Sequence, residues 1–139
     1  MAVTMADIQH LRKMTGAGMM DCKNALNEAN GDFDKAIEII RKKGQAVAAK
    51  REDREASEGC VLAKTQGNYA AVVALQCETD FVAKNGEFIA LTQQILDAAI
   101  EHKPETLEDL LNTQLPNGTV HQLIMDKIGA IGEKMELGY

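Results

Sequence analysis

The chain has 139 residues, and its shares of hydrophobic residues (45%) and charged residues (26%) are typical of a folded protein and exclude an intrinsically disordered one. It contains no apolar run long enough to span a membrane, and residues 1–13 lack the pattern of a signal peptide, so we expect a cytoplasmic protein without a membrane partner. The net charge of −6 also disfavours non-specific binding to nucleic acids.

Neither a metal site nor a disulfide framework is predicted. The chain has three cysteines, none of which belongs to a CxxC pair, and its histidines are scattered. Free cysteine is most often a small buried residue, and we expect this role for Cys22, Cys60 and Cys77. We therefore expect no cofactor.

Three short helices are predicted in the first part of the chain, each with apolar residues along one side, at 5–14, 20–29 and 33–43. Thr4 is the predicted N-cap of the first helix and Asp32 that of the third, and Gly44 is expected to end the third helix. Helices of this length are only marginally stable alone, so we expect them to pack together.

After residue 58 the apolar pattern changes from helical to strand spacing. Two apolar runs rich in β-branched residues, CVLAKT and YAAVVALQC, are separated by QGN, which predicts an antiparallel hairpin with a tight turn. A lone hairpin is marginally stable, so the helices that follow should cover one of its faces. The predicted fold class is α+β, with a three-helix module at 1–45, a polar helical linker at 46–56 and a core subdomain at 57–139.

The core subdomain is predicted to continue with helices at 87–102 and 107–111, a turn at 115–118, and a last helix that ends near Ile131. Thr119 and Gln122 have the spacing of a capping box for that last helix. The final residues, EKMELGY, resemble neither a finished element nor a polar tail. We expect the chain to be a truncated piece of a longer protein, cut at the start of another strand.

Two features of the first module suggest binding roles. Met19 and Met20 are adjacent at a helix start and cannot both face inward, so one should be exposed, either by accident or as a contact for a partner. The preceding TGAG lacks the residues of a phosphate-binding loop and is interpreted as a structural turn. The segment 41–54 carries six basic and two acidic residues, which leaves open a contact with RNA.

The stretch QCETDFVAKN at 76–85 contains a ring without a local structural reason. Phe81 belongs to neither a helix stripe nor a strand, so it either folds back as a plug over the sheet core or is presented as a wedge for another protein. The residues alone favour the plug. Catalysis by Cys77 and Glu78 is not expected, because adjacent strand positions point to opposite faces and no histidine lies near.

Three stretches closely resemble the bacterial elongation factor Ts family, which exchanges nucleotide on elongation factor Tu: TGAGMMDCKNAL at 15–26, EANGDFDKAIEIIRKKG at 28–44 and CETDFVAKN at 77–85. The resemblance implies an N-terminal module similar to ubiquitin-associated domains, which docks on the GTPase domain of the partner through Met19 and Met20. It further implies that Thr79, Asp80, Phe81 and Val82 form the element that dislodges Mg²⁺ from the partner's nucleotide site.

By this resemblance the chain is an exchange factor of protein biosynthesis and not an enzyme. Its partner would be GDP-bound elongation factor Tu, and it would bind no nucleotide, nucleic acid or metal itself. Family members normally continue into a second core subdomain, which is absent from this sequence. The three-helix module also leaves open an adaptor role toward ubiquitin-like proteins, by analogy of fold alone.

Overall fold

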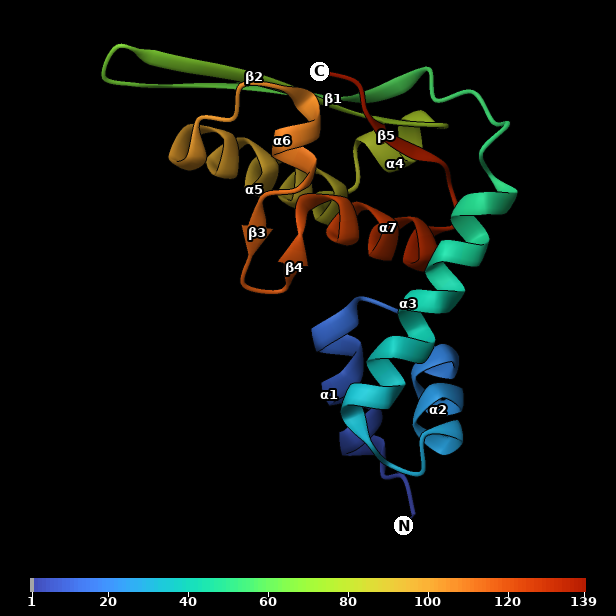
Figure 1. The fold of residues 1–139 in the computed structure, drawn as a ribbon. Coiled ribbons are helices and arrows are strands. Elements are labelled where there is room, and N and C mark those ends of the chain that lie inside the picture. The colour runs from blue at the N-terminus through green and yellow to red at the C-terminus, as the bar shows by residue number, and fades with distance from the viewer. Residues whose placement is uncertain (1) are drawn as a thin grey trace. The chain divides into compact units, whose positions relative to one another are not determined.

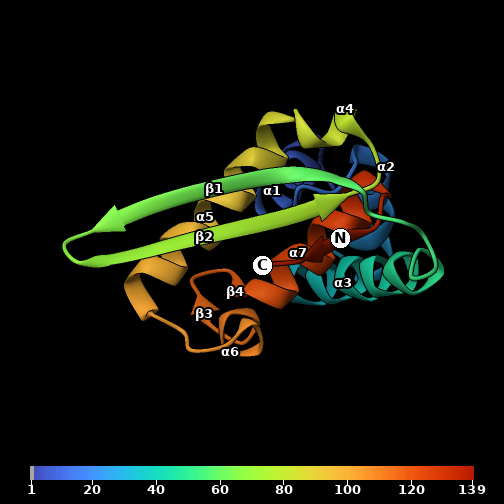
Figure 2. The same ribbon diagram turned by 90° about the horizontal axis from the view of Figure 1, so that it is seen from above.

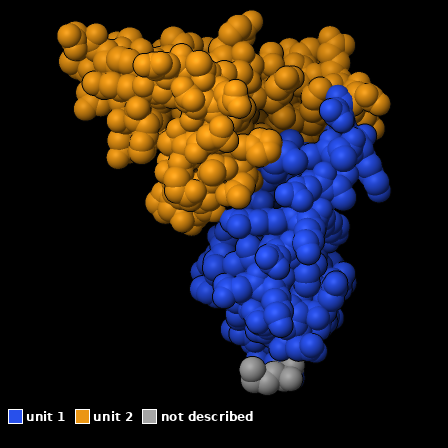
Figure 3. Space-filling view, viewed as in Figure 1, with its two compact units in different colours: residues 1–52, 125–132 blue, residues 53–124, 133–139 orange. Residues whose placement is uncertain are grey.

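The computed structural model describes residues 2–139 and has the predicted α+β class. The chain divides into two compact units (Figure 3). Unit 1 comprises the residues up to Glu52 together with Met125–Gly132, and unit 2 comprises Asp53–Ile124 together with Glu133–Tyr139. None of the helices in the described part of the chain is both long and apolar enough to cross a membrane.

Unit 1 is built on three helices, α1 (Met5–Thr15), α2 (Met19–Glu28) and α3 (Phe33–Lys50), whose ribbons pack against one another in Figure 1. Their starts follow the predicted signals. Thr4 and Asp7 form a reciprocal capping box at α1, and the Asp32 carboxylate accepts a hydrogen bond from the backbone of the first turn of α3. The core consists of small and aliphatic side chains: Ile8, Leu11, Ala17, Cys22, Ala25, Leu26, Ala29 and Ala36.

The prediction that Gly44 ends the third helix is wrong, because α3 continues to Lys50. Gly44 is buried inside the helix, where it lies against Gly129 of α7 (Val120–Ile131). A Cβ atom added to Gly129 would lie only 2.6 Å from the Cα atom of Gly44. The absence of a side chain at Gly44 therefore allows two helix backbones to approach closely, and the residue does not form a left-handed helix end.

Unit 2 contains a three-stranded antiparallel sheet in the order β1-β2-β5. The predicted hairpin is confirmed as β1 (Glu58–Gln66) and β2 (Tyr69–Cys77), joined by a two-residue turn in which Gly67 has a φ of 62°. The third strand, β5 (Met135–Leu137), lies in the final residues, where we expected only the cut start of a strand, and it is paired with the end of β2. Three residues are too few to show an alternating pattern.

Helix α5 (Gly86–His102) covers one face of the hairpin, as Figure 2 shows from above. Its buried side chains include Phe88, Leu91, Ile95 and Leu96. The helix contacts both strands of the hairpin, and Val73 and Leu75 of β2 are buried as well. At its rim, the Lys64 ammonium of β1 lies 3.1 Å from the Asp97 carboxylate. The predicted covering of one sheet face by a helix is thus confirmed.

The remaining elements of unit 2 are short. Helix α6 (Leu107–Leu111) precedes a two-stranded ladder of β3 (Gln114–Leu115) and β4 (Gly118–Thr119), which closes the predicted turn. Thr119 and Gln122 exchange hydrogen bonds between side chain and backbone, which confirms the predicted capping box at the start of α7.

The contact between Gly44 and Gly129 generates a prediction about stability. Alanine normally favours a helix over glycine by about 1 kcal/mol, yet Gly129→Ala should lower the free energy of unfolding by about 1–3 kcal/mol, because its Cβ would overlap backbone that cannot move aside. Gly86→Ala is the matched control, since nothing lies within 4 Å of its added Cβ. Urea denaturation followed by circular dichroism compares the two. Equal stability of both variants would contradict the close helix contact.

Candidate functional site

The predicted contact element lies directly after the end of β2, where Thr79 precedes the four-residue helix α4 (Asp80–Ala83). The Thr79 hydroxyl accepts a hydrogen bond from the backbone of Val82 at 3.4 Å, so it is the N-cap of this turn. Asp80 is exposed and its carboxylate lies 3.9 Å from the Lys84 ammonium. Thr79 and Asp80 therefore begin a short helical turn at the end of the strand.

Phe81 is presented to solvent, because 83% of its surface is exposed. The prediction that it plugs the sheet core is therefore wrong. The ring that fills this role is Phe88, which has no exposed surface and enters the core from the first turn of α5. Asn85 separates the two rings by capping α5, so the chain turns between them. A helix of four residues has no room for an apolar face, and its ring remains outside.

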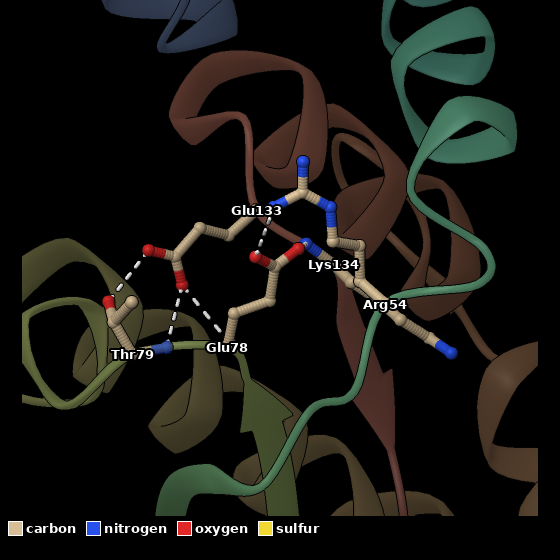
Figure 4. A network of polar contacts seen from close by, with 5 residues as sticks. All are labelled: Arg54, Glu78, Thr79, Glu133 and Lys134. Carbon is tan, nitrogen blue, oxygen red and sulfur yellow. Dashed lines mark hydrogen bonds and ion pairs between the residues drawn. The ribbon is translucent and has the colours of Figure 1, made fainter.

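The start of the turn is held by a carboxylate from a distant part of the chain (Figure 4). Glu133 lies just before β5, and its Oε1 atom accepts hydrogen bonds from the backbone N–H groups of Glu78, at 3.2 Å, and Thr79, at 3.0 Å. Its Oε2 atom accepts a third bond from the Thr79 hydroxyl at 2.6 Å. Three donors of the turn thus converge on one side chain.

A second carboxylate makes the reciprocal contact. The Glu78 Oε1 atom accepts a hydrogen bond from the backbone N–H of Lys134 at 2.9 Å, and its Oε2 atom lies 3.5 Å from the Arg54 guanidinium. Each of the two glutamates therefore binds the backbone of the segment that carries the other, as Figure 4 shows. Both contacts are charge-assisted, which makes them stronger than bonds between neutral groups.

The strand register explains why these residues meet. The ladder between β2 and β5 ends at the pair Cys77 and Met135, so the next opposed residues are Glu78 with Lys134 and Thr79 with Glu133. Beyond the ladder, the side chains of Glu78 and Glu133 take over the role of acceptor from backbone carbonyls. The turn is thus an extension of the sheet in which carboxylates replace the missing ladder bonds.

Cys77 supports the same turn and has no reactive character. Burial raises the pKa of its thiol to about 11, and the nearby Glu133 carboxylate acts in the same direction. The thiol is therefore neutral near pH 7 and donates a hydrogen bond to the Thr79 carbonyl at 3.2 Å. A neutral, buried thiol is a poor nucleophile.

The other predicted contact residues lie in unit 1. Met20 is exposed over 63% of its surface, whereas Met19 is half-buried and packs against the core of the three helices. This confirms that one of the two adjacent methionines faces solvent. Met5 and Met14 of α1 are also exposed, which the sequence analysis did not single out. Flexible thioethers at a surface are typical of adaptable contacts.

The structure shows what surrounds the basic segment at 41–54 and the TGAG turn. Of the six basic residues at 41–54, three lie within ion-pair distance of a carboxylate: Arg41 with Asp126, Lys43 with Asp21 and Arg54 with Glu78. Asp21 stands in the first turn of α2, so the residues after TGAG carry a negative charge, which disfavours an anion there. The described residues also contain no cluster of side chains that could hold a metal ion.

The exposure of Phe81 predicts that the two neighbouring phenylalanines differ in their effect on stability. Phe81→Ala should leave the free energy of unfolding within about 0.5 kcal/mol of the unsubstituted protein, because its ring buries little surface. Phe88→Ala should lower it by about 3–5 kcal/mol, because it empties the core beneath the sheet. Thermal and urea denaturation measure the free energy of unfolding of both variants. A similar loss in the two variants would contradict the exposed position of Phe81.

The sequence is similar to known proteins of one family. Residues 78–138 match the family model described as "Elongation factor TS". The chain is 69% identical over its whole length to elongation factor Ts of Phocaeicola vulgatus and 68% identical to that of Bacteroides thetaiotaomicron, of which it covers 43% and 42%. It is 66% identical to elongation factor Ts of Porphyromonas gingivalis, of which it covers 51%. The chain thus spans about half the length, or less, of these curated relatives, and along that length it belongs to the elongation factor Ts family.

Proposed function

We propose that the chain takes part in translation elongation in the cytoplasm, as the portion of a guanine nucleotide exchange factor that promotes GDP release from elongation factor Tu. Membership of the elongation factor Ts family supports the activity. The observation that carries the role of the site is the exposed ring of Phe81 on a turn held by Glu133. The chain would make and break no covalent bond and would bind no nucleotide itself.

In this mechanism Phe81 enters the GTPase beside the Mg²⁺ ion of the GDP site. A Mg²⁺ ion in that site would offset the negative charge of the GDP phosphates, so its loss would weaken the retention of GDP. Asp80 and Thr79 stand beside the ring and supply polar contacts, and Val82 completes the turn. If the exchange factor binds the empty GTPase more tightly than the GDP-bound GTPase, linkage requires that it weaken the binding of GDP by the same ratio.

Magnitudes show that the ring cannot act alone. Lowering the barrier to release by about four decades requires ~5.5 kcal/mol. Burial of one phenylalanine ring contributes ~1.5–3 kcal/mol, roughly half of that at most. The remainder must come from other contacts with the GTPase, including contacts of the part of the relatives that this chain does not span.

The three-helix module supplies one of these contacts in our proposal. Residues 1–45 would act as the ubiquitin-associated-like module and dock on the GTPase domain, with Met20 as the exposed anchor and Met19 as its half-buried support. Residues 46–56 would act as the linker, and residues 57–139 would carry the turn with Phe81. In this arrangement the module contributes affinity and the turn contributes displacement of the metal ion.

The proposal is tested by the release of fluorescent GDP from elongation factor Tu. Phe81→Ala should slow the release that the factor stimulates by about tenfold or more, because the lost burial is worth more than ~1.4 kcal/mol. Val72→Ala is the matched control, since Val72 is an exposed apolar residue on the outer face of β2. Unchanged release with Phe81→Ala would refute the role of the ring.

The role of the module is tested separately by calorimetry. Met20→Ala should weaken binding of the factor to elongation factor Tu by about 1 kcal/mol without lowering the melting temperature, because the side chain is exposed in the free protein. Lys23→Ala, on the exposed surface of the same helix, would report on a general effect of altering that surface. Equal affinity of the unsubstituted protein and Met20→Ala would exclude Met20 as an anchor.

A further inference from the structure

We propose that Glu133 is a positioning residue, which fixes the turn at Thr79–Val82 and thereby the direction in which Phe81 is presented. Its consequence for nucleotide exchange rests on the proposed function. Glu133 would not touch the partner. It lies 54 residues away from Thr79 in the sequence and acts only through that residue and Glu78.

The turn has few bonds of its own. Helix α4 has four residues, and its internal bonds include those from the N–H of Ala83 to the Thr79 carbonyl, at 3.2 Å, and from the N–H of Lys84 to the Asp80 carbonyl, at 3.1 Å. The cap bond from Val82 to the Thr79 hydroxyl is long, at 3.4 Å. A single helical turn is unfavourable without tertiary support, because nucleation fixes several backbone angles for very few bonds.

Glu133 supplies that support at the first residue of the turn. Its carboxylate receives the backbone N–H groups of Glu78 and Thr79 and also the hydroxyl hydrogen of Thr79. The hydroxyl has one hydrogen, and its donation to Glu133 orients a lone pair toward the N–H of Val82. The same side chain therefore fixes the backbone before α4 and the cap within it.

The support of the turn can be separated from the pairing of the sheet. Bonds between Ala74 and the two residues that follow β5, Gly138 and Tyr139, hold the far end of this strand pair without any contribution from Glu133. The reciprocal bond from Lys134 to Glu78 also leaves the Glu133 carboxylate out. Loss of that carboxylate should therefore loosen the turn and leave the strand paired.

Amide hydrogen exchange of the free protein, measured by NMR, tests this inference without the partner. In Glu133→Ala, the amides of Glu78, Thr79 and Val82 should exchange about tenfold faster or more, as expected when charge-assisted bonds to the backbone are removed. The amides of Ala74 and Gly138 should be unchanged. Glu136→Ala is the matched control, because Glu136 is an exposed glutamate on β5 itself.

Glu133→Gln separates positioning from charge. Glutamine keeps the carbonyl oxygen that accepts both backbone N–H groups, and its amide can donate to the Thr79 hydroxyl, so this variant should restore most of the protection. Faster exchange at Ala74 and Gly138 to the same degree as at Thr79 would overturn the inference, since Glu133 would then hold the strand and not the turn. Unchanged exchange at Thr79 and Val82 in Glu133→Ala would overturn it as well.

Release of fluorescent GDP from elongation factor Tu tests the functional consequence. Glu133→Ala should slow stimulated release several-fold, Glu133→Gln should recover most of it, and Glu136→Ala should match the unsubstituted protein. If Phe81→Ala slows release but Glu133→Ala does not, positioning by Glu133 is overturned while the proposed function stands. If Phe81→Ala has no effect, the proposed function fails, and amide exchange alone decides whether Glu133 holds the turn.

Discussion

Unit 2 depends on a single constraint, which is that strand β2 is hydrogen-bonded along both of its edges. It pairs with β1 over its full length and with β5 at its end, and α5 covers one of its faces. Cys77, its last residue, has a partner on each side, Glu58 in β1 and Met135 in β5. A residue fixed from two sides is a rigid base for whatever follows it. The turn that carries Phe81 begins two residues later, so the sheet determines where this exposed ring lies.

The contrast between Phe81 and Phe88 shows that two neighbouring aromatic rings can take opposite positions relative to the core. The two rings differ by seven residues in sequence, yet one has no exposed surface and the other has 83% of its surface exposed. Burial of an aromatic ring is among the largest favourable terms in folding, and an exposed ring forgoes it. The Asn85 cap and the four-residue helix before it keep Phe81 out of the core. The free energy not gained in folding is available for binding a partner.

Local signals made much of the fold predictable. A cap needs only residues that are three or four apart, so Thr4 with Asp7 and Thr119 with Gln122 could be read directly and are confirmed. The failures concern contacts between distant residues. Gly44 has the sequence context of a helix end, and only its close contact with Gly129 in the folded chain explains why it lies inside a helix. The pairing of β5 with β2 and the contacts of Glu133 have no local signal in the sequence, because both depend on the register between two distant strands. The residues of the candidate site come from the family resemblance and their role stays a prediction, whereas the side chain that holds them was not predicted.

The distance in sequence between Glu133 and the turn has a consequence for the order in which the protein matures. A ribosome adds residues from the N-terminus at about 5–20 per second, so the 54 residues that separate Thr79 from Glu133 take roughly three to ten seconds to appear. During that interval β2 and the phenyl ring of Phe81 exist, but the carboxylate that orders the turn has not yet been made. A nascent chain therefore lacks the three hydrogen bonds that Glu133 accepts from the turn until the last residues of the sheet are added.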